Sequence, residues 1–222
     1  GDFNIGESSD DAMERLIEEE RKSGVFLTVL GFGTGNYQDA KMQKLADKGN
    51  GNYAYIDNLN EAKKNLVTQM GGTLLTIAKD VKIQTEFNPA KVKAYRLIGY
   101  ENRALADKDF NDDKKDAGEI GAGISVTALY EIITDVNDPS LKEIPKTDPL
   151  KYQKPSEKTS AQSSDELLNV KIRYKEPKEN FSKQLEFPLK EQAKKPEETS
   201  DNFRFAASVA SFGLLLRDSK FK

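Results

Sequence analysis

Two different patterns of apolar residues divide the chain. Before about residue 73, apolar residues recur at helical spacing or form short continuous runs. A helix begins at Ser8–Ser9, an apolar strand covers 25–30, a second helix begins at Asp39, and a second strand covers 52–57. Continuous apolar strands are typical of parallel sheets that carry helices on both faces. This part therefore predicts the closing half of a doubly wound, Rossmann-like sheet.

The second pattern begins near residue 74 and consists of short segments in which apolar and polar residues alternate. We interpret five segments as strands: 81–87, 92–100, 124–132, 168–174 and 185–189. Alternation places one face of a strand on a core and the other in water. Several such strands joined by polar turns indicate an antiparallel β-sandwich-like domain. The expected fold class is therefore α/β plus β, with domains at 1–73 and 74–222.

Two segments of the second part have the composition of loops. Four prolines lie among Ser, Thr, Lys and Asp residues between 134 and 165. Such a composition cannot bury enough apolar surface to order itself. We expect a long mobile loop at 134–165 and a shorter one at 190–199.

The last expected element is a helix at 201–219, capped by Asp201, that is apolar around most of its circumference. Its polar stripe is narrow and consists of Arg204, Ser208 and Ser211. Because such a helix must be covered on several sides, we favour a role in covering the β-rich core, or its seam with the α/β part, over a partner-binding face. The candidate partner or domain-interface residues are Phe203, Phe205, Val209, Phe212 and Leu216. The small residues that would permit close approach of a second backbone are Ala206, Ala207, Ala210 and Gly213.

Composition excludes several kinds of chemistry. The 222 residues contain no Cys and no His, which removes disulfides, thiolate nucleophiles, Cys/His zinc sites and His-based acid–base catalysis. The 34 basic and 37 acidic residues give a net charge of -3, so we expect no nucleic-acid partner. No apolar run approaches the roughly 20 residues of a membrane-spanning helix, so we expect no direct membrane span.

A glycine-rich loop, Gly31–Gly35, follows the first strand at its carboxyl end, where open sheets bind ligands. One interpretation is a dinucleotide fingerprint, because Gly31 and Gly33 have the required spacing and Asp57 closes the next strand. Asn36, however, stands where the third glycine belongs. We favour a sharp strand-to-helix turn and keep a nucleotide-binding enzyme domain as the alternative.

Two other segments suggest chemistry that their details do not support. The acidic segment 107–116 invites comparison with a calcium loop, but Lys114 stands at the required glycine and Ile120 at the bidentate glutamate. A solvated acidic loop is therefore favoured. Ser125 follows glycines but lacks the second glycine of a nucleophile elbow, so we interpret it as an ordinary strand residue. The sequence predicts no catalytic residue and no enzymatic activity.

Three stretches carry a resemblance to a known family. They are Gly1-Asp2-Phe3-Asn4, residues 27–36 around the glycine-rich loop, and residues 45–57. In order, spacing and composition they resemble the last third of a bacterial von Willebrand factor type A (VWA) domain. The segments that resemble the uncharacterised C-terminal region attached to this domain in the YfbK-like group are 95–103, 110–118, 127–132 and 203–219.

The resemblance implies a metal-dependent adhesion site, holding Mg²⁺ or Mn²⁺, in a longer protein. The ligand positions of that family precede this chain, so we expect no metal and no cofactor in the chain itself, and we expect the opening half of the sheet to be missing. The candidate ligand-proximal loop residues are Asp2, Asn4, Thr34 and Asn36, and no ligand role is assigned to Asp2 or Asn4.

The function implied by the resemblance is a non-enzymatic, adhesion-type protein-interaction module. It would be extracytoplasmic and envelope-associated, with a protein ligand of unknown identity. A purely structural scaffold is the further alternative to the nucleotide-binding enzyme. Because two parallel strands without neighbours expose an edge, we also expect either a homodimer formed by strand addition or disorder of residues 1–70.

Overall fold

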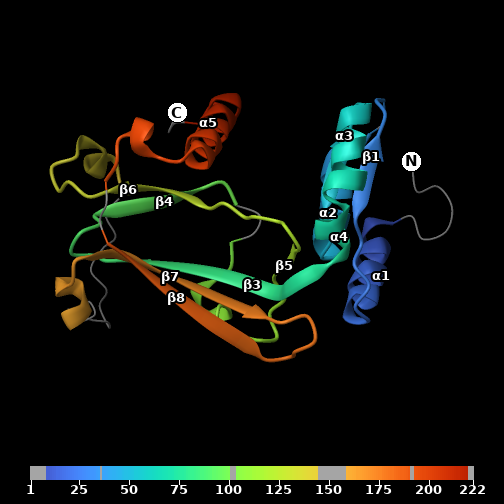
Figure 1. The fold of residues 1–222 in the computed structure, drawn as a ribbon, viewed down its shortest axis with the longest axis horizontal. Helices are drawn as coiled ribbons and strands as arrows, with labels where there is room; N and C mark the ends of the chain where they lie inside the picture. The colour runs from blue at the N-terminus through green and yellow to red at the C-terminus, as the bar shows by residue number, and fades with distance from the viewer. Residues whose placement is uncertain (1–8, 36, 101–103, 145–158, 191–192, 220–222) are drawn as a thin grey trace. The chain divides into compact units, whose positions relative to one another are not determined.

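The computed structural model describes residues 9–35, 37–100, 104–144, 159–190 and 193–219, and the chain forms two compact units (Figure 1). Unit 1 combines the residues up to 82 with 113–125 and 173–183. Unit 2 combines 83–112, 126–172 and 184–222. The architecture is mixed α/β, with a small parallel sheet, a four-stranded antiparallel sheet and a C-terminal helix.

The first elements of unit 1 are two helices and the two strands of the small parallel sheet. Helix α1 (Asp10–Lys22) starts after Ser9, whose Oγ accepts the backbone N–H of Ala12 at 3.3 Å. Strands β1 (Val29–Phe32) and β2 (Tyr53–Ile56) pair in parallel. Helix α2 (Asp39–Lys48) lies between them in the sequence and packs against α1 and both strands. The predicted parallel pair of strands is confirmed. The ion pairs between α1 and α2 are Lys41–Asp10, Lys44–Glu14 and Lys48–Glu18.

Strand β1 begins later than the predicted start at Val25, and its pairing explains why. The N–H of Leu27 donates to the carbonyl of Gly49 at 3.0 Å, outside the strand ladder. The ladder starts at Val29, opposite Tyr53, and the N–H of Val29 donates to the carbonyl of Asn52 at 2.8 Å. Gly51 permits the close approach, since a Cβ there would lie 1.8 Å from the Leu27 carbonyl oxygen. Val25 and Phe26 are also 59% and 37% exposed, so the apolar run predicted neither the burial nor the pairing of its first residues.

A helical segment in three parts leads from β2 to the larger sheet. It consists of α3 (Leu59–Lys63), the π-helical turn η1 (Lys64–Thr68) and α4 (Met70–Leu74). Asn58 begins it by accepting the N–H of Glu61 on its side-chain oxygen at 3.0 Å. The segment contacts β2 at its start and β5 at its end, so it joins two sheets within unit 1.

The four-stranded sheet has the strand order β5-β3-β7-β8. Its strands are β3 (Thr76–Phe87), β5 (Gly118–Gly121), β7 (Glu166–Lys175) and β8 (Ser182–Lys190). The pairing of β3 with β5 shifts register between Ala78 and Val81, where Asp80 has a φ of 50°. The sequence did not predict β5. It did predict a strand at 124–132, whose observed counterpart, β6, covers Leu129–Ile133.

Strands β4 (Ala94–Ile98) and β6 form a separate antiparallel pair in unit 2, with Ala94 opposite Ile133. The Phe87 ring of β3 stacks on Tyr95 of β4 at a centroid distance of 4.2 Å and meets Tyr130 of β6 edge-on at 5.3 Å. Side chains of both sheets therefore share one core. Its members are Phe87, Val92 and Leu167, with Tyr130, Ile132 and Leu168 packed against them.

The two segments predicted as loops contain short 3₁₀ turns where the structure describes them. The turns η4 (Pro139–Glu143) and η5 (Ser160–Ser163) lie in the first segment, and η6 (Pro196–Glu198) lies in the second. A further turn, η3 (Asp107–Asp109), precedes β5. Residues 145–158 and 191–192 lie outside the described residues. The mobility of both loops stays a prediction.

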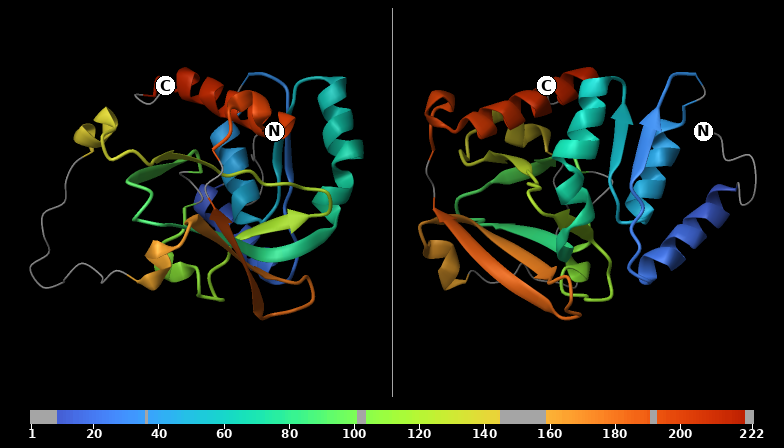
Figure 2. Two further views of the ribbon diagram at one scale, coloured as in Figure 1. Left: turned by 60° about the vertical axis from the view of Figure 1, so that its left-hand side comes forward. Right: turned by 45° about the vertical axis from the view of Figure 1, so that its right-hand side comes forward.

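Helix α5 (Asp201–Leu216) is the last element of unit 2 (Figure 2). Its N-cap is Ser200 and not Asp201 as predicted, because the Ser200 Oγ accepts the N–H of Phe203 at 3.2 Å. Asp201 is instead the first helical residue, where its carboxylate favours the positive end of the helix dipole. The helix ends at Leu216, three residues earlier than predicted, and Asp218 has a φ of 48°.

Candidate functional site

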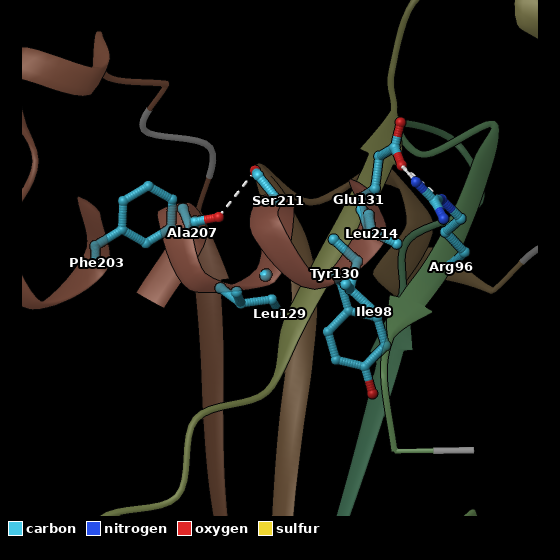
Figure 3. Close-up of a pocket in the computed structure, with 10 residues that line it drawn as sticks. Arg96, Ile98, Leu129, Tyr130, Glu131, Phe203, Ala207, Ser211 and Leu214 are labelled. Carbon is cyan, nitrogen blue, oxygen red and sulfur yellow. Dashed lines mark hydrogen bonds and ion pairs between the residues drawn. The ribbon is translucent and has the colours of Figure 1, made fainter. Parts of the chain in front are cut away.

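Helix α5 lies across strands β4 and β6 and covers a groove of about 340 Å³ (Figure 3). The helix contributes one side of the groove, and Ile98, Leu129 and Tyr130 contribute apolar surface from the strands. In Figure 3, Leu214 lies beside Tyr130 and Glu131. The groove is therefore mainly apolar. The helix residues that line it are Phe203, Ala207, Ala210, Ser211 and Leu214.

The polar groups around this groove bind one another. Arg96 of β4 and Glu131 of β6 form an ion pair across the strands, with the Arg96 Nε donating to Glu131 at 2.5 Å. On the helix, Ser211 donates to the carbonyl of Ala207 at 2.9 Å and Ser208 donates to that of Arg204 at 2.8 Å. The groove therefore presents an apolar surface and a satisfied ion pair, which suits binding of apolar side chains rather than acid–base chemistry.

The opposite side of α5 is apolar and exposed. Phe205 is 73% exposed, Phe212 61%, Leu216 71% and Val209 54%. We call these four residues the outer stripe. At 100° per residue they lie within an arc of about 60°, directly opposite the residues that face the groove. One face of the helix thus lines the groove, and the described residues leave the outer stripe on the other face uncovered.

The structure divides the interface residues that the sequence grouped together. Phe203 lines the groove, whereas Phe205, Val209, Phe212 and Leu216 form the outer stripe. The sequence grouped these five residues as candidates for a partner or domain interface without assigning them to different faces of the helix, and that role stays a prediction. A helical projection in which Ala207 and Ala210 mark the groove face places the outer stripe on the opposite face. The sequence alone contained this information.

A second cluster of polar side chains lies in unit 1, around the acidic segment before β5. The Asp113 carboxylate accepts hydrogen bonds from Ser182 at 2.5 Å and Arg173 at 2.9 Å, and both lower the pKa of Asp113. Lys175 bridges to Asp80 at 2.6 Å and to the carbonyl of Asp113 at 2.8 Å. The segment predicted as a solvated acidic loop therefore holds structural ion pairs.

The same cluster joins the α/β part of unit 1 to β5. Arg21 of α1 pairs with Asp116 at 2.9 Å. The Asn50 amide donates to Asp116 at 3.1 Å and to Glu119 Oε1 at 3.4 Å. Glu119 Oε2 is buried and has no hydrogen-bond partner among the described residues. Burial, followed by the nearby carboxylates of Asp80 and Asp116, raises the pKa of Glu119 to about 7.

The stability of the protein is expected to fall between pH 5 and pH 8 because of Glu119. Its folded-state pKa of about 7 lies above its ordinary value of 4.5, so the folded state keeps a proton that the unfolded state has already lost. This stabilisation is complete below pH 4.5 and disappears as the pH rises through 7. We expect a loss of about 1–2 kcal/mol in the free energy of unfolding, after allowance for partial solvent screening.

Urea unfolding at pH 5, 6, 7 and 8 measures this loss. The substitution Glu119→Gln is expected to remove the dependence on pH. Glu61→Gln serves as the matched control, because Lys64 lowers the pKa of Glu61 and so keeps its titration below this window. A wild-type protein that is equally stable at pH 5 and pH 8 would contradict the prediction.

The loop that follows β1 holds few of the predicted site residues. Thr34 is exposed there, whereas Asp2, Asn4 and Asn36 lie outside the described residues. The Tyr37 ring occupies the space beside Gly31, where a Cβ would lie 1.9 Å from the Tyr37 hydroxyl. Gly31 is thus explained by packing of a tyrosine, and the geometry gives no support to phosphate binding at this glycine.

The tyrosines near this loop form a hydrogen-bonded group. Tyr37 bonds to Tyr53, which donates to Asp39, and the Tyr55 hydroxyl donates to the carbonyl of Gly33 at 2.8 Å. Desolvation, reinforced by the bond to Asp39, raises the pKa of Tyr53. A tyrosine whose pKa is raised keeps its proton, so this group stabilises the loop and supplies no nucleophile at neutral pH.

Within the described residues, no group of three or more acidic side chains has an arrangement that could hold a metal ion. The same part of the chain has no helix with the length and hydrophobicity to cross a membrane. The outer stripe of α5 is one of the exposed apolar sets on the described surface.

Residues 72–222 match the family described as "Uncharacterized protein YfbK, C-terminal". The chain belongs to the YfbK C-terminal family. It is 43% identical over 221 residues to the uncharacterized protein YfbK of Escherichia coli (strain K12), an alignment that covers 100% of this chain and 37% of that protein. The chain thus spans a little over a third of the length of this curated relative. No solved structure matches the chain.

The match to the YfbK C-terminal family confirms the resemblance to the C-terminal region of the YfbK-like group. The matched range includes β3 to α5, and therefore the groove and the outer stripe. The family description assigns no activity, so the function of this surface has to be argued from its structure.

Proposed function

We propose that this chain is part of a non-enzymatic, adhesion-type protein-interaction module. The observation that carries the proposal is the outer stripe of α5, four large apolar side chains that are each more than half exposed. An exposed apolar patch of this kind marks an interaction site more often than an isolated apolar residue does. On the other side, α5 residues line a groove together with residues of β4 and β6.

We further propose that the small parallel sheet is the closing half of a VWA domain, and that the other two sheets form a β-sandwich-like domain. The order α1-β1-α2-β2 with parallel strands supports the first assignment. The shared core around Phe87 supports the second. By the family resemblance, the longer protein would be extracytoplasmic and envelope-associated, and would bind a protein ligand through Mg²⁺ or Mn²⁺.

Calorimetric titration of Mg²⁺ and Mn²⁺ tests the metal part of this proposal. The described residues provide no suitable ligand set, so we expect no heat of binding to this chain. Binding is expected in a longer chain that includes the opening strands of the proposed VWA domain. Absence of binding in the extended chain would remove the metal-dependent site from the proposal and leave the α5 surface.

Site-specific photo-crosslinking tests the interaction surface itself. A photoreactive residue at Phe212 of the outer stripe is expected to give a discrete protein adduct in an envelope fraction. The same residue at Phe187 of β8 is the matched control, because Phe187 is also about half exposed, at 52%, but lies on a different element. The adduct at 212 should disappear when Phe205 is replaced by arginine. If no protein adduct forms at any position of the stripe, the proposed function is wrong.

A further inference from the structure

The outer stripe has the spacing of a coiled-coil seam. Its members, Phe205, Val209, Phe212 and Leu216, are separated by four, three and four residues. This alternation of four and three is the a/d repeat that brings two helices together along their length. A sheet edge or an extended peptide requires no such spacing. The pattern therefore indicates that the partner of this face is another helix.

The flanks of the stripe allow a second helix to approach closely. No charged residue lies between Phe205 and Leu216. Ala206 and Gly213 occupy the same flank one heptad apart, and a Cβ added at Gly213 would meet nothing within 4 Å. Glycine inside a helix is less favourable than alanine, and none of the described residues occupies the space that Gly213 leaves open. Small residues in these positions let two helix backbones pack closely.

We propose that α5 binds a second copy of α5 in antiparallel orientation, so that the chain forms a dimer through the outer stripe. The inference rests on the proposed function and names the partner of the same surface. In a twofold dimer the same surface of each chain contacts its copy. The outer stripe is apolar and uncharged, so two copies of it would bring no like charges together.

The exposed area is sufficient for a weak dimer. Burial of the stripe together with Leu215, which is 60% exposed, would remove roughly 500 Å² from each chain and about 1,000 Å² in total, the lower limit for a specific interface. An interface of this size is consistent with reversible association rather than with an obligate dimer.

The antiparallel orientation follows from the order of the side chains and from the helix dipoles. It places Phe205 against the partner's Leu216 and Val209 against the partner's Phe212, so that each layer pairs a larger with a smaller side chain. It also sets the positive end of each helix beside the negative end of the other. A parallel pair would stack Phe205 on the partner's Phe205 and align the dipoles unfavourably.

Sedimentation equilibrium of the 222-residue chain tests the dimer. We expect association that depends on concentration, and we expect Phe212→Arg to weaken it by at least about 30-fold, as for an aromatic residue at the centre of an interface. Phe187→Arg on β8 is the matched control and should leave the association unchanged. Circular dichroism of both variants establishes that they are folded.

Two results would overturn the inference. One is a wild-type chain that stays monomeric up to about 200 µM, where even a small specific interface should associate. The other is a dimer that survives Phe212→Arg, which would point to another contact such as the edge of the β1–β2 sheet. If the chain is monomeric but position 212 still crosslinks to a different protein, the inference fails while the proposed function stands.

Cysteine crosslinking tests the orientation, and the chain is suited to it because it has no cysteine of its own. In an antiparallel pair, a Phe205→Cys chain mixed with a Leu216→Cys chain should form a mixed disulfide, whereas neither variant alone should crosslink. Position 205 lies eleven residues from position 216, which is roughly 16 Å along the helix. In an antiparallel pair, two cysteines at the same position of the two chains are therefore about that far apart. A disulfide cannot span this distance. Rapid crosslinking of each variant with itself would show a parallel pair and overturn the antiparallel orientation.

Discussion

Replacement of Phe87 by alanine is expected to lower the free energy of unfolding by about 3–5 kcal/mol, the usual cost of removing a buried phenylalanine. Phe87 is 9% exposed and is one of three buried residues at the centre of unit 2. Its ring also stacks on Tyr95 and meets Tyr130 edge-on, and aromatic pairs add to the energy of burial. Alanine would leave a cavity between β3, β4 and β6 that the surrounding strands cannot fully close.

Urea unfolding followed by circular dichroism measures this effect. Phe187→Ala is the matched control, because the same ring is removed from an exposed position on β8. The control is expected to change the free energy of unfolding by no more than about 1 kcal/mol. A loss below 1 kcal/mol for Phe87→Ala would mean that the two sheets of unit 2 do not share the core described above.

This core also determines how α5 is presented. The helix lines the groove beside β4 and β6 with Phe203 and four smaller side chains, and no residue of α5 is buried. An element held by few buried contacts opens more easily than the core does. The strands β4 and β6, by contrast, are fixed by Phe87 and its neighbours. A partner that binds the outer stripe would therefore stabilise the attachment of a helix whose own contacts are modest.

The regular parts of unit 1 could be predicted from local sequence. Helices α1 and α2 both have an acidic first turn and apolar residues at helical spacing, and α1 also has a serine cap at Ser9. The pairing of β1 with β2 followed from the apolar composition of both segments. The start of β1 could not be predicted, because it depends on where β2 begins and on the close approach of Gly51 to Leu27.

Features that depend on distant partners were missed. Strand β5 has four residues, two of them glycines, and pairs with β3 more than thirty residues away. Nothing local in Gly118–Gly121 indicates a strand. The raised pKa of Glu119 has the same origin, since Asp80 reaches it only through the fold. Charge pattern alone suggested a solvated loop at 107–116, because ion pairs to Arg21 and Arg173 are invisible in sequence.

Replacement of Gly121 by alanine is expected to destabilise unit 1 by about 3 kcal/mol, the upper part of the range for overpacking. A Cβ on Gly121 would lie 1.5 Å from the carbonyl oxygen of Gly72. That atom belongs to the backbone of α4, which cannot move aside as the end of a side chain can. This contact connects β5 with α4, the end of the helical segment that follows the parallel sheet. The substitution would therefore separate the parallel sheet and its helices from β5 within unit 1.

Gly118→Ala on the same strand provides the control, because a Cβ there would meet nothing within 4 Å. It is expected to be neutral or to stabilise the protein by a few tenths of a kcal/mol, since alanine restricts the unfolded chain more than glycine does. Urea unfolding of both variants measures the difference. Protease cleavage near residues 70–75 should also become faster in Gly121→Ala and stay unchanged in Gly118→Ala. Equal stability of the two variants would mean that α4 and β5 are not in contact. The connecting backbone and the polar contacts of Asp116 would then be what links the α/β part to β5.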